Sequence, residues 1–361
     1  MSLIQLANAA TRYLRLGKLK GVVDFCVAKV RRNDMTILVT GATGFLGSAL
    51  TTELVKQKQT VRILVRDEQK ARAQFGEAVT IIRGEITDVK QVERAVDGAT
   101  IIYHLVGRLY HPSVPAELYH YSHVEGTHIL LNACKGQKQL KRIVHCSTTG
   151  VHGVTGETPA AENAPFAPTN PYEATKLQGE LLALRAYKED GLPVSIARPG
   201  LVYGPGDLHL LGFFSSIQKG MFRVIDGGKA LLHPIYIDDM TSAFLLCAER
   251  PEAIGQSYNI AGEHPVTIRE LSTSIAHSLD RELPKGSIPL WLAKLASDIF
   301  SVIPGIKGEN APLTRSRVQF LTRSRVYDIS KAKAELSFVP NVGLEIGMKN
   351  TAEWYNKHGY L

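Results

Sequence analysis

A tyrosine and a lysine four residues apart, Tyr172 and Lys176, are the side chains of this sequence best suited to acid–base chemistry. They follow Asn170-Pro171, and a proline at a helix start predicts that the next residues are helical, with both side chains on one face. A tyrosine with its ordinary pKa of about 10 is a poor acid–base catalyst at neutral pH. A nearby ammonium group favours the phenolate, so Lys176 would lower the pKa of Tyr172 into a useful range.

Hydroxyl groups stand where a third catalytic group is expected. The run Cys146-Ser147-Thr148-Thr149 ends an apolar stretch that predicts a buried strand, and one of its hydroxyls could hold the reacting oxygen of a substrate. A tyrosine and a lysine at helical spacing are usually structural. Downstream of this hydroxyl run and of a glycine turn, the pair instead indicates catalysis, and the lysine could also bind a cofactor ribose.

The glycine turn lies between a predicted strand and a predicted helix. Its sequence is Thr40-Gly41-Ala42-Thr43-Gly44-Phe45-Leu46-Gly47. Gly41 allows a tight turn, Gly44 lets the backbone approach a pyrophosphate at the helix N-terminus, and Gly47 lets the helix pack on the strand. A glycine triplet alone is a weak signal, but in this context it predicts a dinucleotide site contacted by the whole turn.

The end of the second predicted strand distinguishes NADP from NAD. An acidic side chain there binds the adenosine ribose hydroxyls, whereas a cation accommodates a 2′-phosphate. The strand ends Leu64-Val65-Arg66, with Val65 where NAD-binding proteins usually carry the acid, and Arg62 is expected to face away. Arg66 therefore predicts a preference for NADP. NAD is the alternative if Arg66 is only a solvated charge that Asp67 partly neutralises.

Short apolar runs separated by helical stretches recur from Thr36 onward. The runs lie at 37–39, 61–65, 79–82, 101–105, 142–146 and 194–197. Continuous apolar strands that alternate with helices predict an α/β fold, a Rossmann-type doubly wound parallel sheet covered on both faces. Ligands of such sheets bind beyond the carboxyl ends of the strands, where the glycine turn and the hydroxyl run are expected.

The chain divides into three regions. Residues 35–204 are expected to form the NAD(P)-binding Rossmann domain with the catalytic residues. Residues 205–361 are rich in proline and predict a smaller C-terminal substrate-binding region, although 257–260 could return to the main sheet. Residues 1–34 are a basic amphipathic N-terminal extension broken at Gly17 and Gly21. It could contact an anionic membrane peripherally or bind a partner, but we favour a helix packed on the protein itself or a poorly ordered tail.

The composition is that of an ordinary globular protein, with 361 residues, 44% hydrophobic and 21% charged. A formal charge of +8 suits a small anionic ligand, and without a basic stripe interleaved with aromatics no nucleic-acid partner is expected. The four cysteines lack metal-ligand spacing, so no metal site is expected, and they fit a reducing compartment. The sequence shows no membrane-spanning run and no secretory signal, which predicts a cytoplasmic location.

In combination these motifs resemble those of the extended short-chain dehydrogenases/reductases. This superfamily includes NAD-dependent epimerases and dehydratases, 3β-hydroxysteroid dehydrogenases and dihydroflavonol reductases, and the resemblance runs from about Thr36 to the C-terminus. It assigns the pyrophosphate to the three glycines of the turn. Counting back from His152-Gly153, it places the catalytic hydroxyl on Thr148, beside Tyr172 and Lys176.

The resemblance implies further cofactor contacts at other strand ends. Glu85 and Ile86 should border the adenine. The cofactor should also be lined after the fourth strand by Leu105, Val106 and Gly107, and the nicotinamide should be covered by the Arg198–Pro205 segment with Pro199, Leu201 and Val202. Helices of this fold often pair two subunits in relatives, which implies a homodimer.

Three departures from the family pattern carry information. Nucleotide-sugar enzymes usually have an asparagine where this chain has Leu201, which disfavours a nucleotide-sugar substrate. Sugar dehydratases follow the catalytic threonine with an Asp-Glu pair, whereas Thr149-Gly150 follow here, so dehydration is not expected. His123 stands where an asparagine is usual, which leaves a backbone-bridging role at that position open.

We therefore expect an NADP(H)-dependent oxidoreductase that interconverts a secondary alcohol and a ketone on an apolar small-molecule substrate of steroid, flavonoid or lipid type. Late apolar residues such as Leu290-Trp291-Leu292 and Phe300 could line its pocket or belong to the core. The alternative enzyme is a nucleotide-sugar epimerase with tightly bound NAD. A non-catalytic cofactor sensor is disfavoured, because a sensor does not need the catalytic set.

Overall fold

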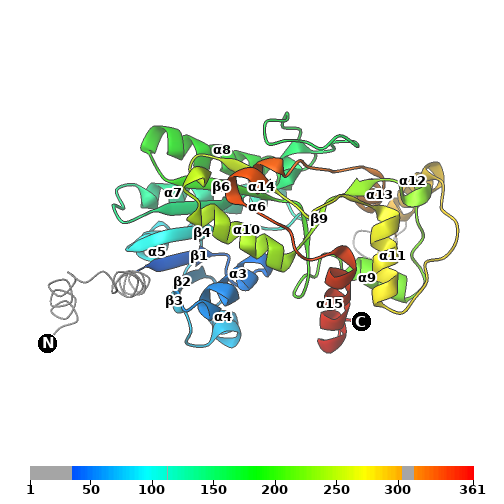
Figure 1. The fold of residues 1–361 in the computed structure, drawn as a ribbon, viewed down its shortest axis with the longest axis horizontal. Helices are drawn as coiled ribbons and strands as arrows, with labels where there is room; N and C mark the ends of the chain where they lie inside the picture. Colours follow the sequence, from blue (N-terminus) through cyan, green and yellow to red (C-terminus); the bar gives the residue numbers. More distant parts are fainter. Residues whose placement is uncertain (1–34, 112, 303–312) are drawn as a thin grey trace, which may run out of the picture.

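The computed structural model describes residues 35–111, 113–302 and 313–361. It shows a larger lobe built on a sheet beside a smaller, mainly helical lobe (Figure 1). The basic segment 1–34 lies outside the described residues, and so does its expected contact with a membrane or partner.

A seven-stranded sheet forms the larger lobe, in the order β10-β6-β5-β4-β1-β2-β3. The strands are β1 (Thr36–Thr40), β2 (Thr60–Val65), β3 (Thr80–Arg83), β4 (Ala99–His104), β5 (Arg142–Cys146), β6 (Val194–Pro199) and β10 (Ser257–Ile260). Every neighbouring pair is parallel. The predicted Rossmann-type doubly wound parallel sheet is therefore confirmed.

Apolar residues alternate between the two faces of the sheet. Leu38, Ile102 and Ile143 pack on the face covered by α5 (Val89–Val96), α7 (Gly126–Cys134) and α8 (Pro171–Asp190). Val39 and Val144 pack on the other face. That face is covered by α3 (Phe45–Lys56), α4 (Glu68–Phe75), α10 (Ile237–Glu249) and α14 (Ser330–Leu336). Helices on both faces explain why the strands are apolar throughout.

The smaller lobe has its own apolar core. Its helices are α9 (Leu211–Gln218), α11 (Ile268–Ser278), α12 (Leu290–Val302), α13 (Arg315–Thr322) and α15 (Leu344–Lys357). Two short strand pairs join it to the sheet lobe: parallel β7 (Leu201–Tyr203) with β9 (Pro234–Tyr236), and antiparallel β8 (Leu231–Leu232) with β11 (Val266–Thr267). Phe214 of α9 and Tyr355 of α15 meet edge to face in this core, with ring centroids 5.0 Å apart.

Short helical segments complete the described chain. They are α6 (Ala116–His120), the π-helix η1 (Tyr121–Glu125), and the 3-10 turns η2 (Thr149–His152), η3 (Asp226–Gly228) and η4 (Pro251–Ala253). Across the described ranges, no helix combines the length and the hydropathy that crossing a bilayer requires.

The chain crosses back to the sheet lobe after it has entered the smaller one. β10 pairs with β6 from Ser257↔Ile196 to Ile260↔Pro199, and α10 and α14 pack on the same lobe. A division of the sequence at residue 204 therefore does not coincide with a division between the lobes.

Candidate active site

The glycine turn joins β1 to α3 and lies tightly against the segment that follows β4. Gly41 has a φ of +75°, and a Cβ at this residue would lie 2.8 Å from the backbone of Leu105 and Val106. A Cβ on Gly47 would lie 2.1 Å from the carbonyl oxygen of Gly41. Both positions require glycine, because any side chain would push the turn away from β4 or from its own helix.

The N-terminus of α3 is open at this turn. Gly44 is the exposed N-cap, and no side chain caps the helix. The amide of Ser48 donates to the Gly44 carbonyl at 2.8 Å, so the preceding amides of the first turn, those of Phe45, Leu46 and Gly47, point out of the helix end. Free amides beside a backbone without Cβ atoms suit a pyrophosphate, so these residues fit a dinucleotide.

Arg66 is exposed directly after β2, at the carboxyl end of the sheet. Arg62 lies inside the same strand and donates to the carbonyl oxygens of Ala95, at 2.9 Å, and Asp97, at 2.5 Å. Arg62 therefore faces away from this end. The Asp67 carboxylate accepts the Lys70 amide at 2.9 Å and caps α4.

The other expected adenine neighbours differ in burial. Glu85 is exposed, and the Tyr121 hydroxyl donates to its carboxylate at 3.4 Å. Ile86 is buried in the core on the α5–α7 side of the sheet and lies against Gly126, where a Cβ would be 2.6 Å from its Cγ2 atom. The Ile86 side chain is thus part of the core.

Tyr172 and Thr148 come together above the carboxyl end of β5. The Asn170 side chain accepts the Glu173 amide at 3.0 Å and starts α8, as the Asn-Pro pair predicts. The Thr148 hydroxyl lies close enough to the Tyr172 hydroxyl to offset in part the effect of burial on the pKa of Tyr172. Thr148 Oγ1 accepts the Gly150 amide at 3.0 Å.

The structure distinguishes Thr148 from its neighbouring hydroxyls. Ser147 Oγ is buried and has no hydrogen-bond partner among the described residues. Thr149 Oγ1 donates to the carbonyl of Pro199 at 3.1 Å and ties the end of β6 to this segment. Thr148 is therefore the hydroxyl of the run that faces Tyr172.

The ammonium group of Lys176 is buried and donates to the Cys146 carbonyl at the end of β5. Burial lowers the pKa of Lys176 and raises the pKa of Tyr172. The expected lowering of the Tyr172 pKa by Lys176 is therefore not present in this structure. Removal of the phenol from water dominates, because burial disfavours the charged phenolate.

His123 bridges the segment after β4 to α8, the helix that carries Tyr172 and Lys176. Its Nε2 atom accepts the Arg108 amide at 3.0 Å, and its Nδ1 atom lies 2.9 Å from Thr175 Oγ1. The Thr175 hydroxyl donates in turn to the Pro171 carbonyl at 2.8 Å. The ring also packs edge-on against Tyr172, with centroids 5.6 Å apart. Relatives usually have an asparagine at this position, and the sequence left open whether a histidine could bridge the backbone here. In the structure His123 does so.

Three buried histidines surround the lysine. Burial lowers the pKa of His104 to about 3 and of His123 to about 2, and it lowers the pKa of His145 well below its ordinary value. The positive charge of Lys176 acts in the same direction on all three. They are neutral at pH 7 and serve as hydrogen-bonding and packing groups.

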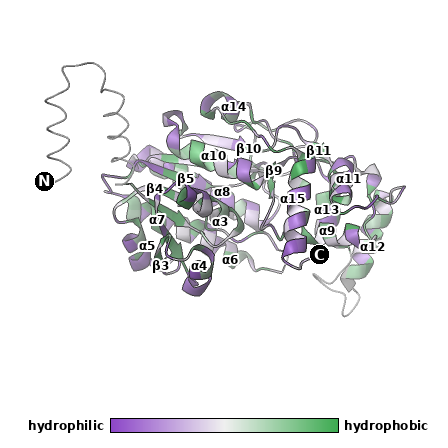
Figure 2. Ribbon diagram, turned by 60° about the horizontal axis from the view of Figure 1, so that its bottom comes forward, coloured by the Kyte–Doolittle hydropathy of each residue, from purple (hydrophilic) through white to green (hydrophobic). Residues whose placement is uncertain are grey.

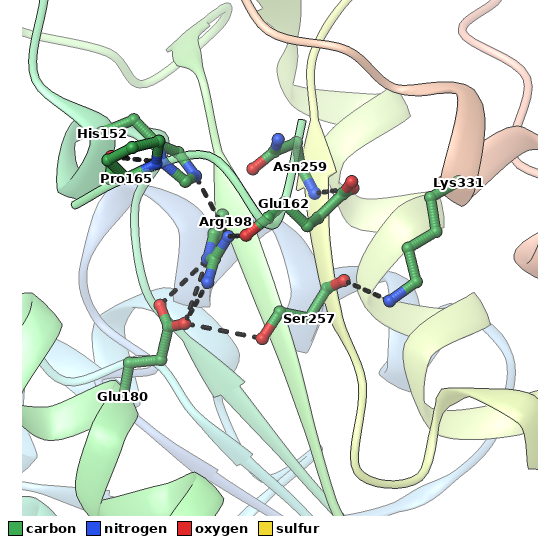
Figure 3. A network of polar contacts seen from close by, with 8 residues as sticks. All are labelled: His152, Glu162, Pro165, Glu180, Arg198, Ser257, Asn259 and Lys331. Atoms are coloured by element: carbon green, nitrogen blue, oxygen red, sulfur yellow. Dashed lines mark hydrogen bonds and ion pairs between the residues drawn. The ribbon is translucent and has the colours of Figure 1, made fainter. Parts of the chain in front are cut away.

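A buried ion pair anchors the middle of α8 to β6 (Figure 3). The Arg198 guanidinium donates through Nε to both carboxylate oxygens of Glu180 at 3.1 Å, and through Nη1 to the Glu162 carbonyl at 3.0 Å. His152 Nε2 lies 3.1 Å from the same Nη1 and is its acceptor, while Nδ1 lies 3.3 Å from the Pro165 carbonyl. Arg198 therefore fixes α8 to β6. The residues that follow Arg198 in the sequence lead toward the candidate site.

A second ion pair connects the catalytic helix to the segment after α13. Arg325 Nη1 lies 2.7 Å from Glu173 Oε1, directly beside Tyr172 in the sequence. The other Glu173 oxygen accepts the Thr169 amide at 2.6 Å.

Leu201 and Val202, the expected nicotinamide neighbours after Pro199, lie half-buried in β7.

The sequence did not reveal three of these residues. Glu180 stands four residues after Lys176, so helical spacing was an available signal that its carboxylate faces the sheet. His123 was marked only as a departure from the family pattern. Arg325 lies far along the chain from Glu173, and no local pattern connects the two.

Comparison with known proteins assigns the family. The family model described as the NAD dependent epimerase/dehydratase family matches residues 37–261. The chain belongs to this family. It is accordingly an NAD(P)-dependent enzyme of the extended short-chain dehydrogenase/reductase type, as the sequence motifs predicted.

Relatives of this epimerase/dehydratase family member include dehydrogenases and reductases. The 3β-hydroxysteroid-dehydrogenase/decarboxylase isoform 2 of Arabidopsis thaliana is 30% identical over 88% of this chain, which spans 62% of that protein's length. The 4-hydroxy-2-methyl-3-oxo-4-farnesyl-3,4-dihydroquinoline-1-oxide ketoreductase of Stigmatella aurantiaca is 28% identical over 87% of this chain and 95% of its own. The UDP-glucuronic acid 4-epimerase of Bacillus cereus, solved with NAD, shares the fold with a TM-score of 0.73 and 23% identity, over 91% of this chain and 100% of that one.

Replacing Glu180 with Gln should destabilise the protein by about 3–5 kcal/mol, because the Arg198 charge would stay buried without its carboxylate. The free energy of unfolding in urea measures this loss. Glu189→Gln, an exposed position on the same helix, is the matched control and should change stability by less than about 0.5 kcal/mol. Equal effects of the two variants would contradict the anchoring role.

Replacing His123 with Asn should weaken the pH dependence of stability. The folded-state pKa of about 2 lies below the unfolded value of about 6.5, so stability is fully present above the unfolded value and falls as pH drops toward the folded one. We expect the slope of the unfolding free energy between about pH 6 and 5 to decrease by up to about 1.4 kcal/mol per pH unit. Thr175→Val removes a partner of His123 but no titrating group, so it should lower stability and leave the slope intact. An unchanged slope in His123→Asn would contradict the buried neutral ring.

Proposed function

We propose that this protein interconverts a secondary alcohol and a ketone on an apolar substrate, with NADP(H) as the cofactor. The observation that carries the proposal is the proximity of the Thr148 and Tyr172 hydroxyls, with the buried Lys176 one turn further along the helix of Tyr172. The glycine turn, with its open helix end, lies against the neighbouring segment Leu105–Val106. Acid–base groups thus stand beside a site that fits a dinucleotide.

The side chains would divide the chemistry as follows. A bound nicotinamide supplies or accepts the hydride. Thr148 would hold the reacting oxygen, and Tyr172 would give it a proton during ketone reduction and take that proton back during alcohol oxidation. Lys176 would hold the end of β5 through the Cys146 carbonyl and bind the ribose beside it. A raised pKa keeps Tyr172 protonated at neutral pH, which favours the reductive direction.

An apolar substrate is supported by exposed apolar side chains on the segments that follow β4 and β5. Leu109 follows the β4 segment, Val154 follows η2, and Phe166 stacks on His152; all three are exposed. Apolar side chains combined with a few polar groups are typical of a small-molecule site. The names of the steroid dehydrogenase and farnesyl-quinoline ketoreductase relatives agree with such a substrate.

The epimerase alternative is less well supported. Its usual diphosphate-binding asparagine is replaced by Leu201, which is half-buried against the apolar core of the smaller lobe. A leucine offers no hydrogen bond to a diphosphate, and the similarity to the solved epimerase concerns the fold.

We further propose a cytoplasmic location, which the buried free thiols of Cys134, Cys146 and Cys247 support.

Cofactor choice is testable by calorimetric titration with NADP⁺ and NAD⁺. We expect NADP⁺ to bind more tightly, and Arg66→Ala to weaken NADP⁺ binding by about tenfold or more, because a charge-assisted bond to the 2′-phosphate is lost. Binding of NAD⁺ should be nearly unchanged, since it lacks that phosphate. Lys188→Ala, an exposed cation on α8, is the control for net charge. Tighter binding of NAD⁺, or copurification with NAD, would instead favour the epimerase.

The direction of the Tyr172 pKa shift predicts opposite pH profiles for the two reactions. Ketone reduction uses the protonated phenol, so its kcat should stay level from about pH 6 to about 9. Alcohol oxidation uses the phenolate and should accelerate as pH rises over the same range. Steady-state oxidation of NADPH with a panel of apolar ketones, and the reverse reaction, measure both.

Tyr172→Phe should reduce kcat in both directions by at least about 100-fold. Tyr187→Phe on the same helix is the matched control and should retain activity. If Tyr172→Phe kept full activity, or if no ketone caused net consumption of NADPH, the proposed reaction would be wrong.

A further inference from the structure

Helix α12 (Leu290–Val302) exposes an apolar face that neither the core nor the candidate site uses. Trp291 is 67% exposed, Leu295 50% and Ile299 49%, and these residues recur every four positions along one side of the helix. Leu292, at 41%, widens the same face. Trp291 and Leu292 thus do not belong to the core, one of the two places expected from the sequence.

The opposite side of α12 is packed. Ala293 is fully buried in a small cluster with Ile225 and Val318, and Ser297 is also buried. The helix is therefore held in place by one face while it presents another to the exterior. Figures 1 and 2 both place it at the end of the molecule remote from α5 and β3.

Basic side chains accompany this face. A cavity of about 290 Å³ between α12 and α13 is lined by Lys294, Arg315 and Arg323, together with the side chains of Ser297 and Thr322. Asp298 also lines it and lies 2.6 Å from the Arg315 guanidinium. Besides the pair of Arg315 with Asp298, the cations Lys285, Lys294 and Arg323 belong to the segments 285–302 and 313–323.

We infer that the α12 face docks on the surface of an anionic lipid bilayer. A tryptophan with aliphatic neighbours on one helix face, bordered by lysine and arginine, is the pattern of helices that lie in the membrane interface. The apolar side chains would enter the boundary between headgroups and acyl chains. The cations around the cavity would meet lipid phosphates, and each basic residue near such a surface contributes to binding.

The positive charge around α12 favours an anionic bilayer over a second copy of the chain as the binding partner of this face. A symmetric contact through α12 would bring Lys285, Lys294 and Arg323 of two copies together, and like charges across an interface oppose association. An anionic bilayer supplies the opposite charge. The inference does not depend on the proposed reaction, since binding to vesicles and turnover of a water-soluble ketone are measured separately.

Tryptophan fluorescence offers a direct test, because the chain has only two tryptophans. Trp354 stacks on His358, with centroids 4.3 Å apart, at the far end of α15. The full-length Trp354→Phe variant therefore reports on Trp291 alone. We expect its emission to shift to shorter wavelength with vesicles of phosphatidylcholine and phosphatidylserine, and much less with phosphatidylcholine alone.

Co-sedimentation with the same vesicles measures the contribution of the face. Leu295→Gln with Ile299→Gln should weaken binding by about tenfold or more, because two exposed aliphatic groups no longer leave water. Ile346→Gln, at a residue 63% exposed on α15, is the matched control and should bind like the unaltered chain. Lys294→Gln with Arg323→Gln should weaken binding to anionic vesicles specifically, by about fivefold for each charge.

Four results would overturn the inference. The chain could fail to bind anionic vesicles, or it could bind them with the Trp291 emission and the Leu295/Ile299 variant unaffected, which would place the contact elsewhere, such as in residues 1–34. Equal binding to neutral vesicles would remove the role of the cations. An emission shift that needs only higher protein concentration would identify the face as a contact between copies. Turnover of a water-soluble ketone by the Leu295/Ile299 variant separates these outcomes from failure of the proposed function.

Discussion

The buried ammonium group of Lys176 constrains the chemistry of everything around it. A charge removed from water is tolerated only if nearby groups compensate it. Here the Cys146 carbonyl accepts a hydrogen bond from it, and the Glu180 carboxylate lies close enough to raise its pKa against the effect of burial. Its other neighbours are neutral side chains, the three buried histidines and the Cys146 thiol, whose pKa burial raises.

The same constraint determines how α8 is held. The helix carries Tyr172 and Lys176, and both have to reach the end of β5 together. It is fixed at its start by the Asn170 cap and by the pair of Glu173 with Arg325, and further along by the pair of Glu180 with Arg198. His123 adds a bridge from the first turn to the segment after β4. Tyr172 and Lys176 are thus positioned by the cap of their own helix and by contacts to distant parts of the chain.

Much of this arrangement could be predicted from the sequence, because its signals are local. The strand runs, the glycine turn and the Asn-Pro start of α8 each depend on a few neighbouring residues, and each is present in the structure. The choice of Thr148 among three hydroxyls required the family resemblance. In the structure the Ser147 hydroxyl is buried without a hydrogen-bond partner among the described residues, and the Thr149 hydroxyl is bonded to the Pro199 carbonyl.

What escaped prediction depends on tertiary contacts. Arg325 meets Glu173 only because the chain returns from the smaller lobe. The periodicity of the sequence is local and cannot predict such a contact. The lowered pKa expected for Tyr172 failed because a spacing of four residues says nothing about burial, which acts in the opposite direction. The exposed face of α12 was missed for a similar reason, since its apolar residues look the same in the sequence whether they face the core or the exterior.

The return of β10 to the sheet has a consequence for how this protein can be rebuilt. A chimera that exchanged everything after residue 204 would import the strand at one edge of the sheet as well as most of the smaller lobe. If the imported strand did not match β6, the amide and carbonyl groups that β10 now pairs along β6 would become an open edge, and such edges recruit strands from other molecules. Grafts confined to the segments between β10 and α14 would leave the pairing of β10 with β6 intact.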